Sequence, residues 1–211
     1  MRINYILKLM CLAFFTFLYS CDDYEEKLHS SCEISGKTFY GTTESITLNF
    51  QNLTELPNCI SNLVRLTEIN LSSNLLTSLP AGIGNWKNMY SMGIYLNQLT
   101  SLPNNIGNLK KLNWLRLWSN NLSILPESIG ELTNLNRLEL HRNELTNIPE
   151  SIGKLKNLTY LSLSSNQLTS LPESITELKD NLLDLYLRDN NFTDEEKKKV
   201  ELWLPNTDIR W

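Results

Sequence analysis

The chain repeats itself with a period of 23 residues. A Leu-Pro or Ile-Pro pair recurs six times, and the five intervals between the pairs are all 23 residues. The pairs are Leu56-Pro57, Leu79-Pro80, Leu102-Pro103, Leu125-Pro126, Ile148-Pro149 and Leu171-Pro172. A fixed period in the twenties predicts a solenoid, in which each unit buries its apolar side against its neighbours. Function must then be sought on a surface that the units build together.

Each unit carries the pattern L-x-x-L-x-L-x-x-N-x-L. One copy consists of Leu135, Leu138, Leu140, Asn143 and Leu145. The last copy, from Leu182, belongs to a unit that is one residue longer, and a degraded first copy has Gln51 in place of the Asn. This pattern resembles the leucine-rich repeat family over roughly residues 42–193. The resemblance implies an arc or horseshoe that binds a partner, in most relatives a protein.

The physical reading of the pattern agrees with the resemblance. The x-L-x-L-x core alternates with period two, so it predicts a short strand with leucines inward and the x positions outward. Stacked units then give a concave parallel sheet of about seven short strands. The prolines block a full helix on the convex side, which we expect to be irregular or 3-10. The predicted class is an α/β solenoid. Trp86 and Met89 replace leucines in the second unit and predict a locally swollen or rearranged core.

The N-terminal segment is typical of an exported protein. Residues 1–20 contain no acidic residue, and a short apolar run at 9–19 follows Arg2 and Lys8, as in a signal peptide. The sequence Leu18-Tyr19-Ser20-Cys21 resembles a bacterial lipobox, although Tyr19 departs from the usual small residue. This resemblance implies that Cys21 is lipidated and that the protein lies in the bacterial cell envelope, at the outer membrane or cell surface. Secretion without a lipid and an uncleaved anchor are the alternatives.

The predicted organisation has five parts. They are a signal peptide at 1–20, an acidic tether at 21–31, an N-terminal cap with the degenerate repeat at 32–55, six repeats at 56–193, and a C-terminal capping helix with an edge strand at 194–211. Thr193 and Glu196 form a capping box for that helix, and Ile209 and Trp211 suit the edge strand. Cys32 and Cys59 are the two cysteines of the folded part. They form either a disulfide that staples the cap to the first convex turn or two free thiols.

The outward strand positions predict a binding surface on the concave face. The first two strands offer small and polar residues, whereas large aromatic residues and arginines gather from the third strand onward. The predicted ligand-binding residues are Tyr95, Trp114, Arg116, Trp118, Arg137, Glu139, His141, Tyr160, Tyr186 and Arg188. Such residue types dominate binding hot spots. The alternative is that neighbouring rings only stabilise the sheet.

Register within this surface predicts specific neighbours. We expect Tyr95, Trp118 and His141 to stack across consecutive strands, and Arg137 to lie between two aromatic rings. Arg116 should face Glu139 in the next strand. Gly93 lies beside these residues and could leave a shallow pocket.

Catalysis finds no support in the sequence. The repeats contain one histidine, His141, and the chain has no His-Glu-x-x-His, Cys-x-x-Cys, phosphate-binding Gly loop or Gly-x-Ser-x-Gly elbow. We therefore expect no enzymatic activity, no cofactor and no metal. The net charge of −4 argues against nucleic acid as a partner. The expected function is protein or peptide binding, with glycan binding or a scaffold without a ligand as alternatives.

Overall fold

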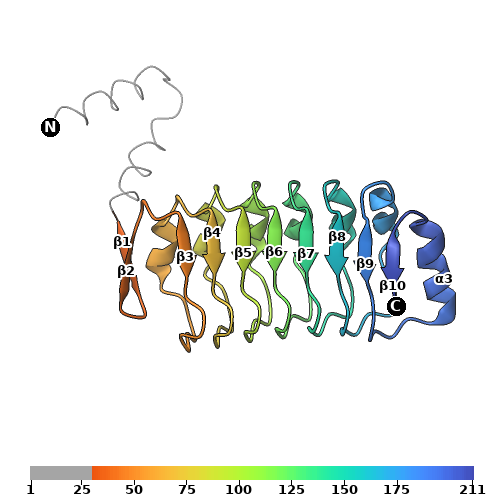
Figure 1. The fold of residues 1–211 in the computed structure, drawn as a ribbon, viewed down its shortest axis with the longest axis horizontal. Coiled ribbons are helices and arrows are strands. Elements are labelled where there is room, and N and C mark those ends of the chain that lie inside the picture. Colours follow the sequence, from red (N-terminus) through yellow and green to blue (C-terminus); the bar gives the residue numbers. More distant parts are fainter. Residues whose placement is uncertain (1–29) are drawn as a thin grey trace, which may run out of the picture.

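A computed structural model describes residues 30–211 as one row of stacked repeats (Figure 1). The expected signal peptide, Cys21 and nearly all of the acidic tether lie outside the described residues. Ser31, placed in the tether by the sequence, already begins the first strand, β1 Ser31–Ile34. The described residues include no helix with the length and apolar character needed to cross a bilayer.

Eight short strands form one parallel sheet in which neighbours in sequence are neighbours in space. They are β3 Ser45–Thr47, β4 Glu68–Asn70, β5 Ser91–Gly93, β6 Trp114–Arg116, β7 Arg137–Glu139, β8 Tyr160–Ser162, β9 Asp184–Tyr186 and β10 Asp208–Arg210. The first seven are the repeat strands expected from the sequence, and β10 adds the edge strand. Pairing places equivalent positions opposite each other, as with Leu115 and Leu138. The predicted leucine-rich repeat solenoid is confirmed.

The other side of the row consists of short 3-10 turns, as Figure 1 shows behind the strands. They are η1 Asn58–Asn62, η2 Ala81–Asn85, η3 Asn104–Asn108, η4 Glu127–Glu131, η5 Glu150–Lys154 and η6 Glu173–Leu178. A proline with extended backbone directly precedes every one of them, for example Pro126 at φ −70° and ψ 147°. The prolines therefore set the start of each convex turn, because their ring fixes φ and removes an N–H donor.

A ladder of buried asparagines holds the turns that follow the strands. The Asn143 amide donates to the carbonyls of Leu117 (3.0 Å) and Leu140 (2.9 Å), and its oxygen accepts from the Leu122 N–H at 3.0 Å. The same arrangement recurs at Asn120 and at Asn166. Each amide thus binds three backbone groups, and each of these carbonyls accepts from the amides of two consecutive repeats, as Leu117 does from Asn120 and Asn143.

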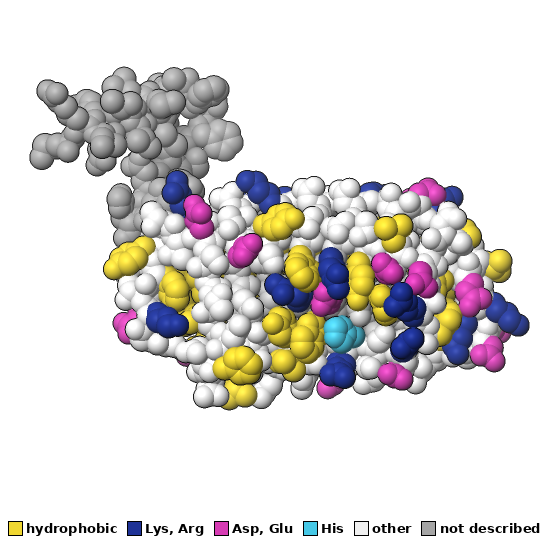
Figure 2. All heavy atoms as spheres, viewed as in Figure 1, with side chains coloured by type: hydrophobic (Ala, Val, Ile, Leu, Met, Phe, Trp, Pro, Cys, Tyr) yellow, Lys and Arg dark blue, Asp and Glu magenta, His cyan; other side chains and the backbone are white. Residues whose placement is uncertain are grey.

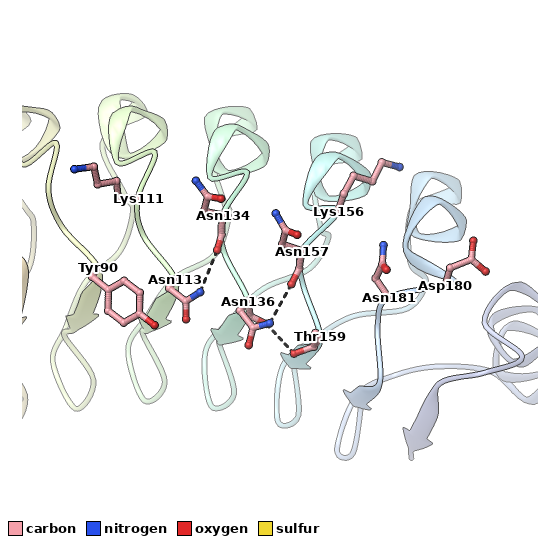
Figure 3. Close-up of a pocket in the computed structure, with 10 residues that line it drawn as sticks. All are labelled: Tyr90, Lys111, Asn113, Asn134, Asn136, Lys156, Asn157, Thr159, Asp180 and Asn181. Atoms are coloured by element: carbon pink, nitrogen blue, oxygen red, sulfur yellow. Dashed lines mark hydrogen bonds between the residues drawn. The ribbon is translucent and has the colours of Figure 1, made fainter.

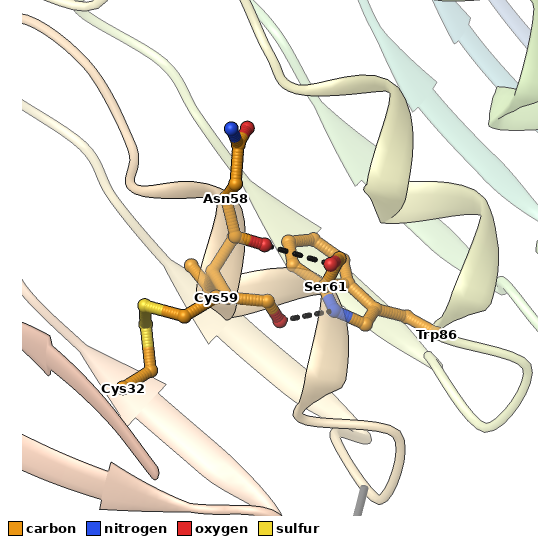
Figure 4. The surroundings of a disulfide bond; sticks show 6 residues. Cys32, Asn58, Cys59, Ser61 and Trp86 are labelled. Carbon is orange, nitrogen blue, oxygen red and sulfur yellow. Dashed lines mark hydrogen bonds between the residues drawn. A yellow bond between two sulfur atoms is a disulfide. The ribbon is translucent and has the colours of Figure 1, made fainter. Parts of the chain in front are cut away.

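The substitutions in the second unit are absorbed without a break in the sheet. Trp86 and Met89 are both fully buried, and β5 keeps its register with both neighbouring strands. The Trp86 indole N–H donates to the Ile60 carbonyl at 3.0 Å, so the larger ring reaches into the preceding unit (Figure 4).

Both ends of the solenoid are covered. At the N-terminal end, β1 and β2 Lys37–Tyr40 form an antiparallel hairpin, and Cys32 of β1 is joined by a disulfide to Cys59 of η1 (Figure 4). Their Cα atoms are 5.3 Å apart. At the C-terminal end, α3 Asp194–Trp203 is capped by Thr193, whose hydroxyl accepts from the Glu196 N–H at 3.2 Å. Val200 of this helix is fully buried against the last repeat.

Candidate binding surface on the concave face

The outward side chains of β5 to β9 and of the residues directly after them form the concave cluster. The cluster consists of the predicted residues Tyr95, Trp114, Arg116, Trp118, Arg137, Glu139, His141, Tyr160, Tyr186 and Arg188. Figure 2 shows hydrophobic, basic and histidine side chains gathered over the middle of the row, whereas the surface over β4 is mostly uncharged and polar. The structure therefore brings the predicted residues together on one face.

Three rings form a stack at the end of the strands. Tyr95 and Trp118 lie 4.4 Å apart between ring centroids with planes 12° apart, and Trp118 and His141 lie 5.3 Å apart with planes 8° apart. The rings occupy the same position in three consecutive repeats, so the spacing of the strands sets the spacing of the stack. The stacking expected from register is present.

A second row alternates rings and guanidinium groups. The Arg116 guanidinium lies 4.1 Å from the Trp114 ring centroid, and Arg137 lies 5.4 Å from Trp114 and 3.9 Å from Tyr160. Tyr160 in turn contacts the Tyr186 ring at 5.1 Å. Trp114 thus has one arginine on each side. Cation–π contacts hold both guanidinium groups in fixed positions.

Glu139 binds Arg137 rather than the arginine that it faces across the sheet. Register places Arg116 opposite Glu139, as expected. The Glu139 carboxylate, however, accepts from Arg137 Nε at 2.6 Å and from the Trp114 indole N–H at 3.1 Å. Arg137 reaches it within one strand, because residues i and i+2 point to the same side. Arg116 is therefore left with a hydrogen bond to Ser91 Oγ at 3.3 Å.

The Arg116 side chain also fills the space above Gly93. A Cβ on Gly93 would lie 3.4 Å from Arg116 Nη2 and 3.5 Å from Cζ. The space that suggested a shallow pocket at Gly93 is therefore occupied by the guanidinium. The guanidinium thus covers Gly93 at van der Waals distance.

Most of the concave cluster is half-buried by its own members. The rings and both Arg116 and Arg137 are partly exposed, Arg188 is exposed, and Glu139 retains 7% of its surface. Burial lowers the pKa of His141, with Arg142 acting in the same direction and Glu139 opposing it. Burial also raises the pKa of Tyr160, against the influence of Arg137. Both side chains are consequently uncharged at neutral pH, and the charge of the cluster resides in its arginines and Glu139.

Sequence reasoning missed an apolar extension beside the ring stack. Phe50, Leu75 and Leu96 lie in the turns that follow the strands and expose 76%, 40% and 43% of their surfaces. Phe50 and Leu96 also have positive φ values of 56° and 55°, which are costly for bulky residues. Other repeats have Ser119 or Ser165 at this position. Comparing equivalent positions between repeats would have revealed this apolar edge.

A polar groove of about 700 Å³ lies elsewhere, along the edge where the chain enters the strands (Figure 3). Its lining includes Tyr90, Lys111, Asn134 and Asn157, and none of the concave cluster. The Asn134 amide donates to the Lys110 carbonyl at 2.7 Å, and Asn157 donates to the Thr133 carbonyl at 2.8 Å. These amides link adjacent repeats. The groove is therefore explained by packing of the solenoid, and Tyr90 is the one aromatic side chain among the described residues that line it.

The geometry around His141 does not form a catalytic site. The structure places Ser162 Oγ 3.2 Å from His141 Nδ1, a pairing that sequence reasoning did not foresee. Ser162 is only 4% exposed, and the nearby Glu139 carboxylate is bound to Arg137 and Trp114. A nucleophile must reach its substrate and needs an oriented base. Residues 30–211 also hold no group of three or more His, Cys, Asp or Glu side chains suited to a metal ion.

Comparison with known proteins agrees with the fold. Leucine-rich repeat family models match residues 65–86, 110–168 and 133–192. No curated protein matches the chain. The chain is a leucine-rich repeat protein, and members of this family are generally binding scaffolds without enzymatic activity.

Solved structures of similar proteins come from bacteria and plants. A leucine-rich repeat protein of Leptospira interrogans is 34% identical with a TM-score of 0.63, covering 81% of this chain and 49% of its own. An internalin of Listeria monocytogenes is 27% identical with a TM-score of 0.66, covering 79% of this chain and 47% of its own. The ectodomain of the Arabidopsis thaliana receptor kinase GASSHO1/SCHENGEN3, solved with CASPARIAN STRIP INTEGRITY FACTOR 2, is 31% identical with a TM-score of 0.68. It covers 79% of this chain and 21% of its own. The chain thus spans about half the length of the two bacterial proteins.

Proposed function

We propose that this leucine-rich repeat protein binds a protein or peptide partner through its concave cluster. The observation that carries the proposal is the gathering of aromatic rings and arginines on the strands from β5 onward, on a face that the leucine core does not need. Rigid aromatic rings lose little entropy on binding, and Trp, Tyr and Arg dominate interface energies.

The similar structures support this class of partner. The plant receptor ectodomain was solved with its factor bound, and the chain shares the repeat architecture of that receptor. The concave cluster is also broad and shallow, because its side chains stand on a single open sheet. A surface of this shape suits a protein segment better than an enclosed small molecule.

We further propose that the protein acts in the bacterial cell envelope, anchored by a lipid on Cys21. This proposal rests on the lipobox-like sequence ending at Cys21 and on the acidic stretch that follows it. Metabolic labelling with a fatty-acid analogue, applied to the wild type and Cys21→Ser, tests it. Label that remains in Cys21→Ser contradicts the anchor.

Differential capture tests the binding function. The full-length chain and a Trp114→Ala/Trp118→Ala variant are each used to capture partners from bacterial envelope extracts, and both are applied to a glycan array. Because central tryptophans often contribute 2 kcal/mol or more, we expect capture of a protein to weaken roughly 30-fold or more in the variant.

A matched control removes apolar side chains away from the concave face. Tyr90 and Leu202 are 51% and 81% exposed on other surfaces, so Tyr90→Ala/Leu202→Ala should retain capture. Equal capture by all three proteins, or none by the wild type, contradicts the proposal and supports a scaffold. A glycan held by the wild type and lost by the tryptophan variant assigns sugar binding instead.

A further inference from the structure

Arg116 carries a positive charge that no acidic side chain of residues 30–211 neutralises. The ion pairs of this part of the chain include Arg137 with Glu139 and Arg210 with Asp208, but none with Arg116. Its Nε is buried without a hydrogen-bond partner, and its contact with Ser91 at 3.3 Å is long. Most donors of this guanidinium are therefore unused.

The position of Arg116 is nevertheless fixed. The guanidinium lies between the rings of Trp114 at 4.1 Å and Tyr95 at 5.8 Å, and it rests on Gly93. The carboxylate nearest in register, Glu139, is already bound by Arg137 and Trp114. A half-buried arginine held in this way is preorganised for an anion, since little further ordering is needed when one binds.

We propose that Arg116 binds a carboxylate of an acidic peptide segment, with neighbouring apolar side chains of that segment contacting Tyr95 and Leu96. The planar guanidinium matches the two oxygens of a carboxylate, which would receive its unused terminal N–H groups. Tyr95 borders Arg116, and Leu96 follows with 43% of its surface exposed. This inference rests on the proposed function and specifies the chemistry of the partner.

The charges around Arg116 favour a partner that places one carboxylate on this arginine over a partner with a strongly anionic surface. Glu139 lies beside Arg137, and Asp184 and Glu68 also lie on the concave face. These acidic groups would repel an extended polyanion near Arg116, whereas a single carboxylate meets the unpaired charge of this arginine. Arg188 also forms no ion pair within residues 30–211, but it lies three strands away, after β9. Like-charge contacts of this kind give specificity against the wrong partner.

The test uses defined peptides and the full-length chain. The first pair is Ac-Gly-Glu-Leu-Glu-Leu-Gly-NH2 and its Gln analogue, and the second pair is Ac-Gly-Leu-Gly-Leu with a free or an amidated C-terminus. These pairs distinguish a side-chain carboxylate from a terminal one. Inorganic phosphate serves as the probe for a general anion site. Binding is followed by tryptophan fluorescence and by the Arg116 Nε–H resonance in NMR spectra.

We expect at least one carboxylate peptide to shift the Arg116 resonance and its uncharged partner to leave the resonance unchanged. Arg116→Gln should weaken binding of the carboxylate peptide about 10- to 100-fold, as loss of a charge-assisted hydrogen bond predicts. Arg116→Lys should recover only part of the affinity, because lysine keeps the charge and loses the planar fork. Arg142→Gln is the matched control, since Arg142 is exposed in a turn outside the cluster, and it should bind as the wild type does.

Several outcomes overturn the inference. They are equal binding of charged and uncharged peptides, unchanged affinity in Arg116→Gln, and phosphate binding as tight as that of the carboxylate peptide. Amide spectra of each variant show whether the fold is retained. If a captured partner binds Arg116→Gln normally, the carboxylate site is wrong and the proposed function stands. If the carboxylate peptides bind and no partner is captured, the site stands and the proposed function fails.

Discussion

Trp114 connects the charged and aromatic halves of the concave cluster. Its ring contacts both arginines, and its indole N–H donates to Glu139 at 3.1 Å. The same hydrogen bond helps to hold the carboxylate on Arg137 and away from Arg116. Trp114 and Arg137 thus both bind the Glu139 carboxylate, and Arg116 is left without an acidic partner.

His141 gives the concave face a dependence on pH. Burial lowers its pKa in the folded protein, so the folded state releases the proton that the unfolded state keeps. The stability contributed by neutral His141 is therefore complete above the unfolded pKa of about 6.5 and declines as pH falls through the lower folded value. We expect the melting temperature to fall between about pH 7 and 5, measured by thermal unfolding across this range.

His141→Gln isolates this contribution. Glutamine does not titrate, so the melting temperature of the variant should depend less on pH than that of the wild type. The contributions of the other titrating groups should remain. An NMR titration of the His141 ring supplies the direct readout. A folded pKa above 6.5 would show that attraction to the Glu139 carboxylate outweighs burial, and the prediction would be wrong.

At the scale of the elements, the asparagine ladder fixes the path of the chain between strand and turn. The residue before each ladder position has a positive φ, as at Arg142 (57°), so this turn bends back sharply in every repeat. The adjacent amide satisfies the backbone groups that the bend exposes to the core. The first unit differs, because the Gln51 side chain donates only to the nearby Asn49 carbonyl at 2.9 Å.

Asn143→Leu should therefore be far more damaging than Gln51→Leu. The first change leaves the Leu122 N–H without its side-chain partner. It also removes one of the two amide donors to each of the Leu117 and Leu140 carbonyls, which keep Asn120 and Asn166. At about 1–3 kcal/mol for the unsatisfied N–H and about 0.5–1.5 kcal/mol for each lost hydrogen bond to a carbonyl, we expect a loss of about 2–6 kcal/mol. Gln51 is exposed, and its replacement should cost under about 0.5 kcal/mol. Urea unfolding of both variants measures the difference, and similar losses would contradict the role of the ladder.

Close approach between convex turns explains another repeated residue. A Cβ on Gly130 would overlap the Ser151 backbone oxygen of the next turn. The glycine therefore permits the 3-10 turns η4 and η5 to pack directly against one another. Its repetition in the sequence reflects contact between repeats.

For the whole molecule, the sequence predicted those features that depend on period and alternation. Inward leucines, strand register and the stack of Tyr95, Trp118 and His141 all follow once equivalent positions are aligned, because each repeat places them identically. The choice that Glu139 makes between two arginines could not be predicted in this way. It depends on side-chain rotamers and on the Trp114 indole, which has no equivalent in the other repeats.

The extent to which the concave cluster is buried could not be predicted from the sequence either. Alternation identifies Trp114 and Tyr160 as outward-facing, but the degree to which they cover each other and Arg137 depends on how the side chains tilt. Phe50 and Leu96 were missed for a different reason, since the apolar period marks core positions and gives no account of an exposed apolar residue in a turn.

Stability in a solenoid is distributed along its length, and the Cys32–Cys59 disulfide should act mainly on the end where it lies. Because each repeat contacts only its neighbours, a defect at one end need not reach the other. Closing a sequence separation of 27 residues contributes roughly 3–4 kcal/mol in the chain-entropy model.

Hydrogen exchange in Cys32→Ala/Cys59→Ala tests this local effect. We expect exchange to accelerate at the Leu48 N–H, which donates to the Asn70 carbonyl at the same end as the disulfide. The Leu163 N–H, which donates to the Tyr186 carbonyl, should keep its protection. Val200→Ala, which opens the opposite cap, should give the reverse pattern. Equal acceleration at both amides in either variant would mean that the repeats unfold as one cooperative unit, and that the ends do not have independent stability.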